Sequence, residues 1–158
     1  MADLVHRSSR TIDQRPAVVH DRLLGLGARL RDELPPIQAG TQAASVLGVT
    51  GQVPIEIRDL GTGRIEMRTM SGRIRVEAVA DLQPVDGGRT ALALSIAIKP
   101  QGLAASMMLG AGVQMAGGRQ KLVDSLDRVL DDLVVELAKP DGAWDATTWT
   151  PPGLNLGG

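Results

Sequence analysis

Few side chains in this sequence of 158 residues could do chemistry, and several of them lie near its N-terminus. The chain has two histidines, His6 and His20, and no cysteine. His6, Ser8 and Arg10 are spaced two residues apart, so they share one face if this segment is a strand. On an inward face they could hold the carboxylate or carbonyl group of a ligand. On an exposed or edge strand they would be ordinary solvated side chains.

His20 is the other candidate for proton transfer, although a lone histidine on a helix is more often packed and hydrogen-bonded than catalytic. No spacing of histidines and carboxylates suggests a metal site, and without cysteine there is no thiolate ligand or thiol nucleophile. The glycine-rich segments 25–30 and 110–118 look like pieces of phosphate-binding loops. Such loops need the alternation of strand and helix that this chain lacks. The sequence therefore predicts no catalytic residue, no metal and no cofactor.

The charge and hydropathy of the chain limit its partners. The 17 basic and 18 acidic side chains give a formal net charge of -1, which argues against nucleic acid or an anionic membrane surface as the main partner. The N-terminus lacks the apolar segment of a secretory signal. The uncharged segment 100–118 has nearly the length of a membrane span, but glycines interrupt it. We expect a cytoplasmic protein without an integral membrane span.

The spacing of apolar residues predicts the elements that must position these side chains. Residues 3–13 are expected to form a first strand. A helical stripe runs through residues 16–34, and Gly25 and Gly27 predict that this segment forms two short helices. An antiparallel run of strands separated by turns follows, with a further candidate strand before it. These strands are expected at residues 53–60, 64–70, 73–85 and 89–99, and the further candidate at 43–49.

The last strand and the segment after it have distinctive faces. One face of strand 89–99 carries large aliphatic residues, whereas the other carries alanines and a serine that a second subunit could approach closely. An apolar stripe then predicts one long helix from about residue 103 to 139, with the uncharged segment as its first half. Residues 141–158, which include Trp144 and Trp149, are expected to form an extended or disordered tail after a domain of residues 1–140.

This order of elements resembles the START-like helix-grip superfamily, also called SRPBCC, which includes pollen-allergen-like proteins and polyketide cyclases. The segment IDQRPAVVH supplies Ile12, Pro16 and Val19 of the family's strand-to-helix junction, with His20 where an aromatic residue is usual. The segment IKPQGLAASM matches the family's junction before the long helix. The resemblance covers about residues 3–139. It implies an α+β fold in which a curved antiparallel sheet wraps around a long C-terminal helix, with two short helices after the first strand and an elongated apolar cavity.

The composition is compatible with such a cavity. The chain has two tryptophans, no tyrosine and no phenylalanine, so the bulky residues that would fill a gap between helix and sheet are scarce. Methionines could instead form an adaptable lining. The alternative is that the helix lies closer to the sheet and these methionines are ordinary core.

We therefore predict a carrier or sensor that binds a small hydrophobic ligand, such as a lipid, an isoprenoid or a polyketide-like molecule. Two alternatives remain open. One is a polyketide cyclase- or dehydratase-like enzyme of the same fold, and the other is an interaction module that docks another protein or forms a homodimer. The predicted ligand-binding residues are Arg10, His20, Ile55, Ile57, Met67, Val76, Leu94, Ile96, Met107, Met108, Ala111 and Met115.

Overall fold

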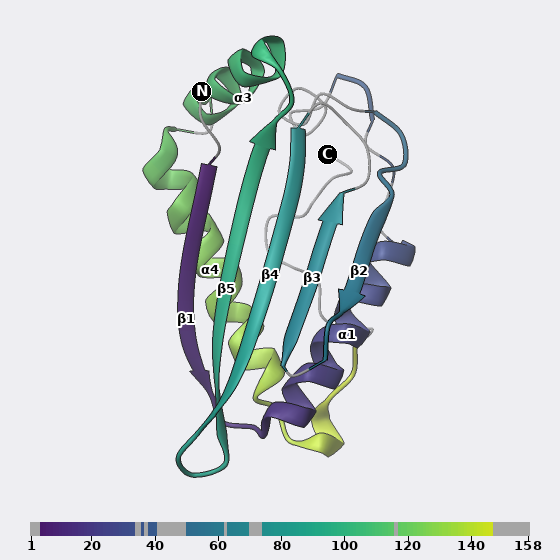
Figure 1. The fold of residues 1–158 in the computed structure, drawn as a ribbon, viewed down its shortest axis with the longest axis vertical. Helices are drawn as coiled ribbons and strands as arrows, with labels where there is room; N and C mark the ends of the chain where they lie inside the picture. The colour runs from purple at the N-terminus through teal and green to yellow at the C-terminus, as the bar shows by residue number, and fades with distance from the viewer. Residues whose placement is uncertain are drawn as a thin grey trace.

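The computed structural model describes residues 4–33, 36, 38–40, 50–61, 63–69, 74–115 and 117–146. The candidate strand at 43–49 and Trp149 lie outside these residues. The elements are β1 (Leu4–Ile12), α1 (Pro16–Glu33), β2 (Ile55–Asp59), β3 (Arg64–Thr69), β4 (Ile74–Val85), β5 (Arg89–Pro100), α3 (Leu103–Met115), α4 (Arg119–Leu137) and the short 3-10 helix η1 (Asp141–Ala143) (Figure 1).

The described strands form one antiparallel sheet in the order β1-β5-β4-β3-β2. Strands β2 to β5 pair with their neighbours in sequence, as the turn residues between them predict. β1 forms the edge of the sheet opposite β2. It pairs with β5, with Leu4 opposite Ile98 and Ile12 opposite Thr90. Together with the C-terminal helix this confirms the predicted α+β, helix-grip class.

The two faces of the sheet differ because successive side chains of a strand point to opposite sides. Helices α1 and α4 lie behind the sheet in the view of Figure 1. The main core forms on that side, where Val19 and Leu26 of α1, Leu92 of β5, and Leu130 and Leu137 of α4 are buried together. We call this the inner face of the sheet.

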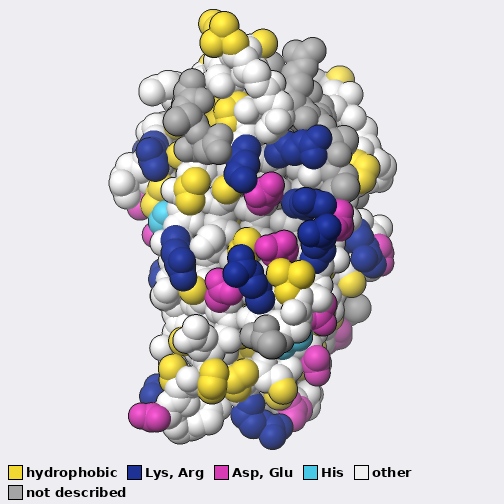
Figure 2. All heavy atoms as spheres, in the orientation of Figure 1, with side chains coloured by type: hydrophobic (Ala, Val, Ile, Leu, Met, Phe, Trp, Pro, Cys, Tyr) yellow, Lys and Arg dark blue, Asp and Glu magenta, His cyan; other side chains and the backbone are white. Residues whose placement is uncertain are grey.

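The opposite, outer face carries charged side chains that pair across the strands. Figure 2 shows basic and acidic side chains interspersed over it. Glu56 on β2 accepts hydrogen bonds from Arg58 at 2.6 Å and from Arg68 of β3 at 3.2 Å. Lys99 of β5 donates to Glu77 of β4 at 2.8 Å. Because the charges are paired in this way, the outer face is a solvated surface and does not form a single anion site.

Two predictions about the helices are wrong. Helix α1 runs without a break through Gly25 and Gly27. The uncharged segment forms a separate helix, α3, and is not the first half of α4. Gly117 and Gly118 both have φ near 98°, a left-handed conformation that ends α3 and that glycine adopts without strain. Their N–H groups donate to the carbonyls of Gln114 and Val113, at 3.1 and 2.9 Å respectively.

The break also changes which face of the uncharged segment is buried. A continuous helix would place Met108, Ala111 or Gly112, and Met115 on the inward face. In the structure Ala105, Leu109 and Val113 of α3 form a small second core with Ile74 and Ile98 of the sheet. Ala111 is exposed. Within the described residues, no helix is both long and apolar enough to cross a membrane.

Arg22 holds the segment after α4 against α1. Its side chain is buried, and its guanidinium donates to the carbonyls of Leu137 and Lys139 and to the carboxylate of Asp141. The ring of Trp144 lies over the same guanidinium, 4.8 Å from its carbon atom. These contacts satisfy carbonyls at the C-terminal end of α4 that have no partner within the helix.

Candidate ligand-binding cavity

A cavity of about 300 Å³ lies between the inner face of the sheet and helices α1 and α4. Every described residue that lines it is apolar. The lining consists of Leu23, Leu26, Gly27 and Leu30 of α1, Ile57 of β2, Ile65 and Met67 of β3, Ala78 and Ala80 of β4, Leu94 and Ile96 of β5, and Val129 and Leu133 of α4.

Small side chains in the middle of the sheet leave this space open. Ala78 and Ala80 on β4 lie opposite Ile96 and Leu94 of β5. On its other side Ala78 lies opposite Met67 of β3. The neighbours of the two alanines are therefore large, while the alanines themselves reach only one carbon beyond the backbone. The strand that crosses the centre of the sheet forms the floor of the cavity.

Helix α1 forms the wall across from β2. The stripe that contains Leu23, Leu26 and Leu30 faces the sheet because these residues recur at helical spacing. Gly27 interrupts this stripe and lets the helix approach β2 closely. A Cβ atom at position 27 would lie 3.1 Å from Cδ1 of Ile57, which is tighter than an ordinary contact. The position of α1, and with it the width of the cavity, depends on a glycine here.

The structure brings together some of the residues that the sequence predicted to bind a ligand. Ile57, Met67, Leu94 and Ile96 all line the cavity. Ile55 and Val76 are half-buried on β2 and β4, and they are not among the described lining residues.

None of the ligand-binding residues predicted on the uncharged segment is among the described residues that line the cavity. Met107 is 69% exposed and Ala111 is also exposed, both on α3, whose buried face contacts the second core. The side chains of Met108 and Met115 lie outside what the structure describes.

Arg10 and the side chains near it contact α4 and do not line the cavity. Arg10 donates to the carboxylate of Asp131 at 2.7 Å. The hydroxyl of Ser8 donates to Asp127 at 2.6 Å, and Nε2 of His6 lies 3.0 Å from the same carboxylate oxygen. These contacts, with that of Ser8 first, lower the pKa of Asp127 below its ordinary value.

This cluster contains a serine, a histidine and an aspartate, but it lacks the arrangement of a nucleophilic triad. In a triad the serine contacts one ring nitrogen of the histidine and the aspartate contacts the other. Here Ser8 and Asp127 both contact Nε2 of His6, at 2.9 and 3.0 Å. The cluster therefore fastens β1 to α4, and it does not activate Ser8.

His20 has a similar connecting role between α1 and β2. Its Nε2 lies 2.9 Å from a carboxylate oxygen of Asp59. The backbone N–H of Gly61 donates to the same oxygen at 3.0 Å. The N–H of Gly61, and after it the ring of His20, lower the pKa of Asp59. His20 is not part of the cavity lining that the structure describes.

The chemistry available inside the cavity is therefore limited. Its described lining has no titratable side chain, so none of these residues can transfer a proton to a bound molecule. No three of the described histidines, aspartates and glutamates lie close enough together to hold a metal ion.

Solved structures of other proteins align with this chain at TM-scores below 0.5. A protein from Thermus thermophilus aligns with 17% identity and a TM-score of 0.48, over 85% of this chain and 97% of that one. A START superfamily protein from Mycobacterium smegmatis aligns with 10% identity and a TM-score of 0.43, over 78% and 97% of the two chains. The Zhui aromatase/cyclase from a Streptomyces species aligns with 12% identity and a TM-score of 0.42, over 90% and 99%.

The chain itself has an α+β, helix-grip fold. No family model matches the sequence, and no curated protein matches it either. At identities this low a likeness describes a fold, and it carries neither a ligand nor a reaction from one protein to another. The function must follow from the cavity itself.

Proposed function

We propose that this protein binds a small hydrophobic ligand in the cavity between its sheet and helices α1 and α4. The observation that carries the proposal is the lining, in which each described residue is apolar around a volume of about 300 Å³. Ligand pockets typically begin at about this volume and are mostly apolar. Binding of this kind is driven by burial of apolar surface.

The dimensions and the lining indicate the kind of ligand. An engineered cavity of about 150 Å³ lined by aliphatic and aromatic residues stays dry and takes up benzene. The cavity here has about twice that volume. It suits a fused two-ring hydrocarbon, or a branched or short unbranched aliphatic segment of a lipid, isoprenoid or polyketide-like molecule. Because its described lining offers no hydrogen bond from a side chain, any polar group of the ligand would lie towards the cavity mouth.

Native mass spectrometry on gently purified protein, followed by denaturing extraction, tests this proposal directly. We expect a co-purifying apolar molecule. Uptake of the apolar dye N-phenyl-1-naphthylamine gives a second readout that needs no knowledge of the natural ligand. Protein stripped of its ligand should bind the dye with increased fluorescence, and the extracted molecule should displace it.

Two variants of β4 separate binding in the cavity from binding elsewhere. Ala78→Trp places an indole ring in the cavity and should abolish dye uptake, because Ala78 is a lining residue. Val79→Trp is the matched control, since the neighbouring side chain points to the outer face of the sheet. If the two variants take up dye equally well while both remain folded, the cavity is not the binding site.

The enzyme alternative makes a different demand on the same cavity. A cyclase- or dehydratase-like reaction by general acid–base catalysis needs a group that donates or accepts a proton beside the ligand. Neither His6 nor His20 lines the described cavity, and both contact an aspartate elsewhere. These positions favour binding without catalysis, which is the function that we propose.

A further inference from the structure

Helix α3 carries an exposed apolar ridge at one end of the molecule. Leu103 is 79% exposed and Met107 is 69% exposed, the two largest values among the exposed large hydrophobic residues. Ala111 is exposed one turn further on. These three residues recur every four positions, so they form one stripe along the helix. We call this stripe the α3 ridge.

The ridge differs from a scattering of surface apolar residues because α3 has no charged side chain. The face opposite the ridge, with Ala105, Leu109 and Val113, already packs on the sheet. At the top of Figure 2, where α3 lies, the coloured side chains that are visible are hydrophobic and none is charged. A helix that is apolar on both its buried and its exposed face indicates a surface that is covered in use.

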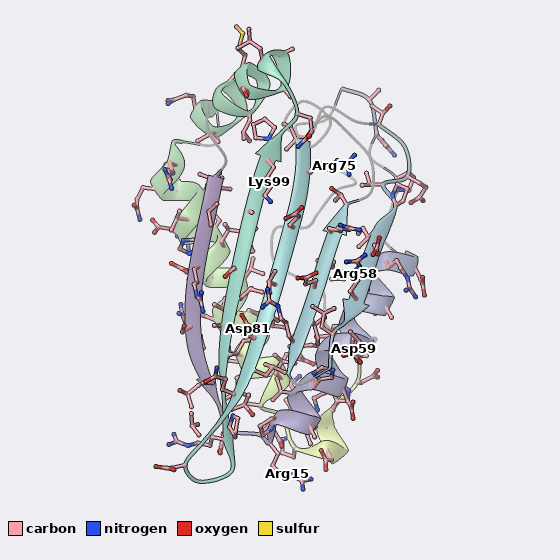
Figure 3. All side chains as sticks on the ribbon, viewed as in Figure 1. Arg15, Arg58, Asp59, Arg75, Asp81 and Lys99 are labelled. Atoms are coloured by element: carbon pink, nitrogen blue, oxygen red, sulfur yellow. The ribbon has the colours of Figure 1, made fainter. Side chains whose placement is uncertain are left out.

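Basic side chains follow this helix at its C-terminal end. Arg119 and Lys121 lie at the start of α4, where both are exposed. The described acidic side chain nearest to them along α4 is Asp124, which accepts a hydrogen bond from Gln120. Lys99 and Arg75, before the other end of α3, lie opposite each other on β5 and β4 and belong to the outer face of the sheet, where Lys99 binds Glu77 (Figure 3). Despite the overall charge of -1, the described residues at the start of α4 therefore carry a small excess of positive charge.

We propose that the α3 ridge docks on the surface of a lipid bilayer that contains anionic lipids. Apolar side chains at the ridge would enter the boundary between headgroups and acyl chains, and Arg119 and Lys121 beyond its C-terminal end would contact anionic headgroups. The helix has 13 residues, so it lies along the surface and does not span the bilayer. Glycines with positive φ bound α3 at Gly102 and Gly117, so its ends turn sharply away from the helix.

A second copy of the chain is the other obvious occupant, and the charges disfavour it. In a two-fold symmetric contact each patch meets its own copy. If two α3 ridges met with their C-terminal ends together, Arg119 and Lys121 of one chain would approach the same cations of the other. An anionic bilayer instead supplies the opposite charge to these two residues.

Flotation of the full chain with lipid vesicles tests the proposal. We expect the protein to float at low ionic strength with vesicles of phosphatidylcholine and phosphatidylglycerol, and more weakly with phosphatidylcholine alone. The double variant Leu103→Gln/Met107→Gln should bind at least about tenfold more weakly, because interfacial binding scales with the apolar area that is buried. The control Val135→Gln removes a residue of α4 that is 67% exposed and should leave flotation unchanged.

The variants also separate charge from apolar contact. Arg119→Gln/Lys121→Gln should weaken flotation with the anionic vesicles only. Equal flotation with both kinds of vesicle would overturn the choice of an anionic partner. No flotation of the wild-type protein, or equal flotation of the ridge variant, would overturn the docking site itself. A dimer in sedimentation velocity that the ridge variant converts to a monomer, without vesicle binding, would assign the ridge to a second copy.

This inference is independent of ligand binding. None of the substituted residues lines the cavity, so dye uptake by the ridge variant should equal that of the wild-type protein. Failure of vesicle binding with normal dye uptake would refute the docking site alone. Failure of dye uptake with normal flotation would refute the proposed ligand site alone.

Discussion

Replacing Ala78 with leucine should stabilise the ligand-free protein, which is the reverse of the usual effect of enlarging a core residue. Ala78 lines the cavity and lies between Met67 and Ile96 of the neighbouring strands. Leucine adds three carbon atoms at this position. Each buried methylene contributes about 0.8 kcal/mol, so the added burial is worth about 2.4 kcal/mol. Fixing the leucine rotamer removes about 0.5–1 kcal/mol of this gain.

The net gain is therefore about 1–2 kcal/mol. For a domain of this size 1 kcal/mol shifts the melting temperature by about 2–4 °C. Calorimetry on protein stripped of its ligand should show Ala78→Leu melting about 2–8 °C above the wild type. The control Ala97→Leu, on the outer face of β5, should raise the melting temperature less, because the leucine side chain there stays in contact with water.

A destabilising effect of Ala78→Leu on the ligand-free protein would refute this reasoning. Where a site is already filled, inserting methylenes costs about 1–3 kcal/mol, because neighbours must move off their preferred rotamers. A fall in the melting temperature of Ala78→Leu, with Ala97→Leu unchanged, would mean that the space beside Ala78 is not open. A rise for the stripped protein together with weaker uptake of an apolar dye would connect the volume to ligand binding.

Three further substitutions test contacts outside the cavity. Arg22→Met should lower the free energy of unfolding measured in urea by about 2–4 kcal/mol, since carbonyls after α4 lose a buried donor. Trp144 emission should then shift to the red, and an unchanged spectrum would mean that the ring does not rest on this guanidinium. Asp127→Asn should lower the melting temperature at pH 7. Because the pKa of Asp127 is lowered in the folded protein, its charge stabilises the fold fully above about pH 4, near the pKa of an aspartate in the unfolded chain. This stabilisation is lost as the pH falls through the pKa of Asp127 in the folded protein. A difference from wild type that stays constant from neutral pH to about pH 2.5 would contradict this. Gly63→Ala should destabilise by at least about 2 kcal/mol more than Gly61→Ala. Both residues have positive φ, but only at Gly63 would a Cβ atom meet a backbone oxygen, at 2.5 Å. Equal urea midpoints for the two variants would disprove the close approach.

The strands and their inward faces could be predicted from the sequence because their signal is local. Alternation along residues 74–82 and 92–98 assigns each side chain to one face, and pairing in register carries that assignment across the sheet. Leu94 and Ile96 were placed in the cavity on this basis, and the structure has them in its lining.

Contacts between distant elements could not be predicted in the same way. Arg10 was expected to hold a ligand, yet it binds Asp131 on α4, which alternation along β1 cannot reveal. Asp127 and Asp131 of α4 both contact β1, and neither the alternation of β1 nor the helical spacing of α4 indicates these contacts. Partner choice depends on how α4 crosses the sheet, which is a property of the packed structure.

Helical spacing gave a misleading result where glycines changed its phase. The stripe of α4 was extended backwards through Gly117 and Gly118, which placed Ala111 on the buried side. The turn at these glycines starts a new helical phase, so Leu109 and Val113 are buried instead. The adjacent glycine pair was the available signal, and an apolar stripe on both sides of it concealed the break.

The pairing of β1 with β5 has a consequence for how the chain folds as it is synthesised. β1 leaves the ribosome first, yet the strand that completes its hydrogen bonds is made only after most of the domain. Contacts so far apart in sequence form slowly, because a long loop must close before they are made. Until then β5 presents an open edge and Ile12 has no core to enter. We expect amide protection in β1 to appear after protection in the β3–β4–β5 meander, which makes the nascent protein most prone to mispairing just before its first strand docks.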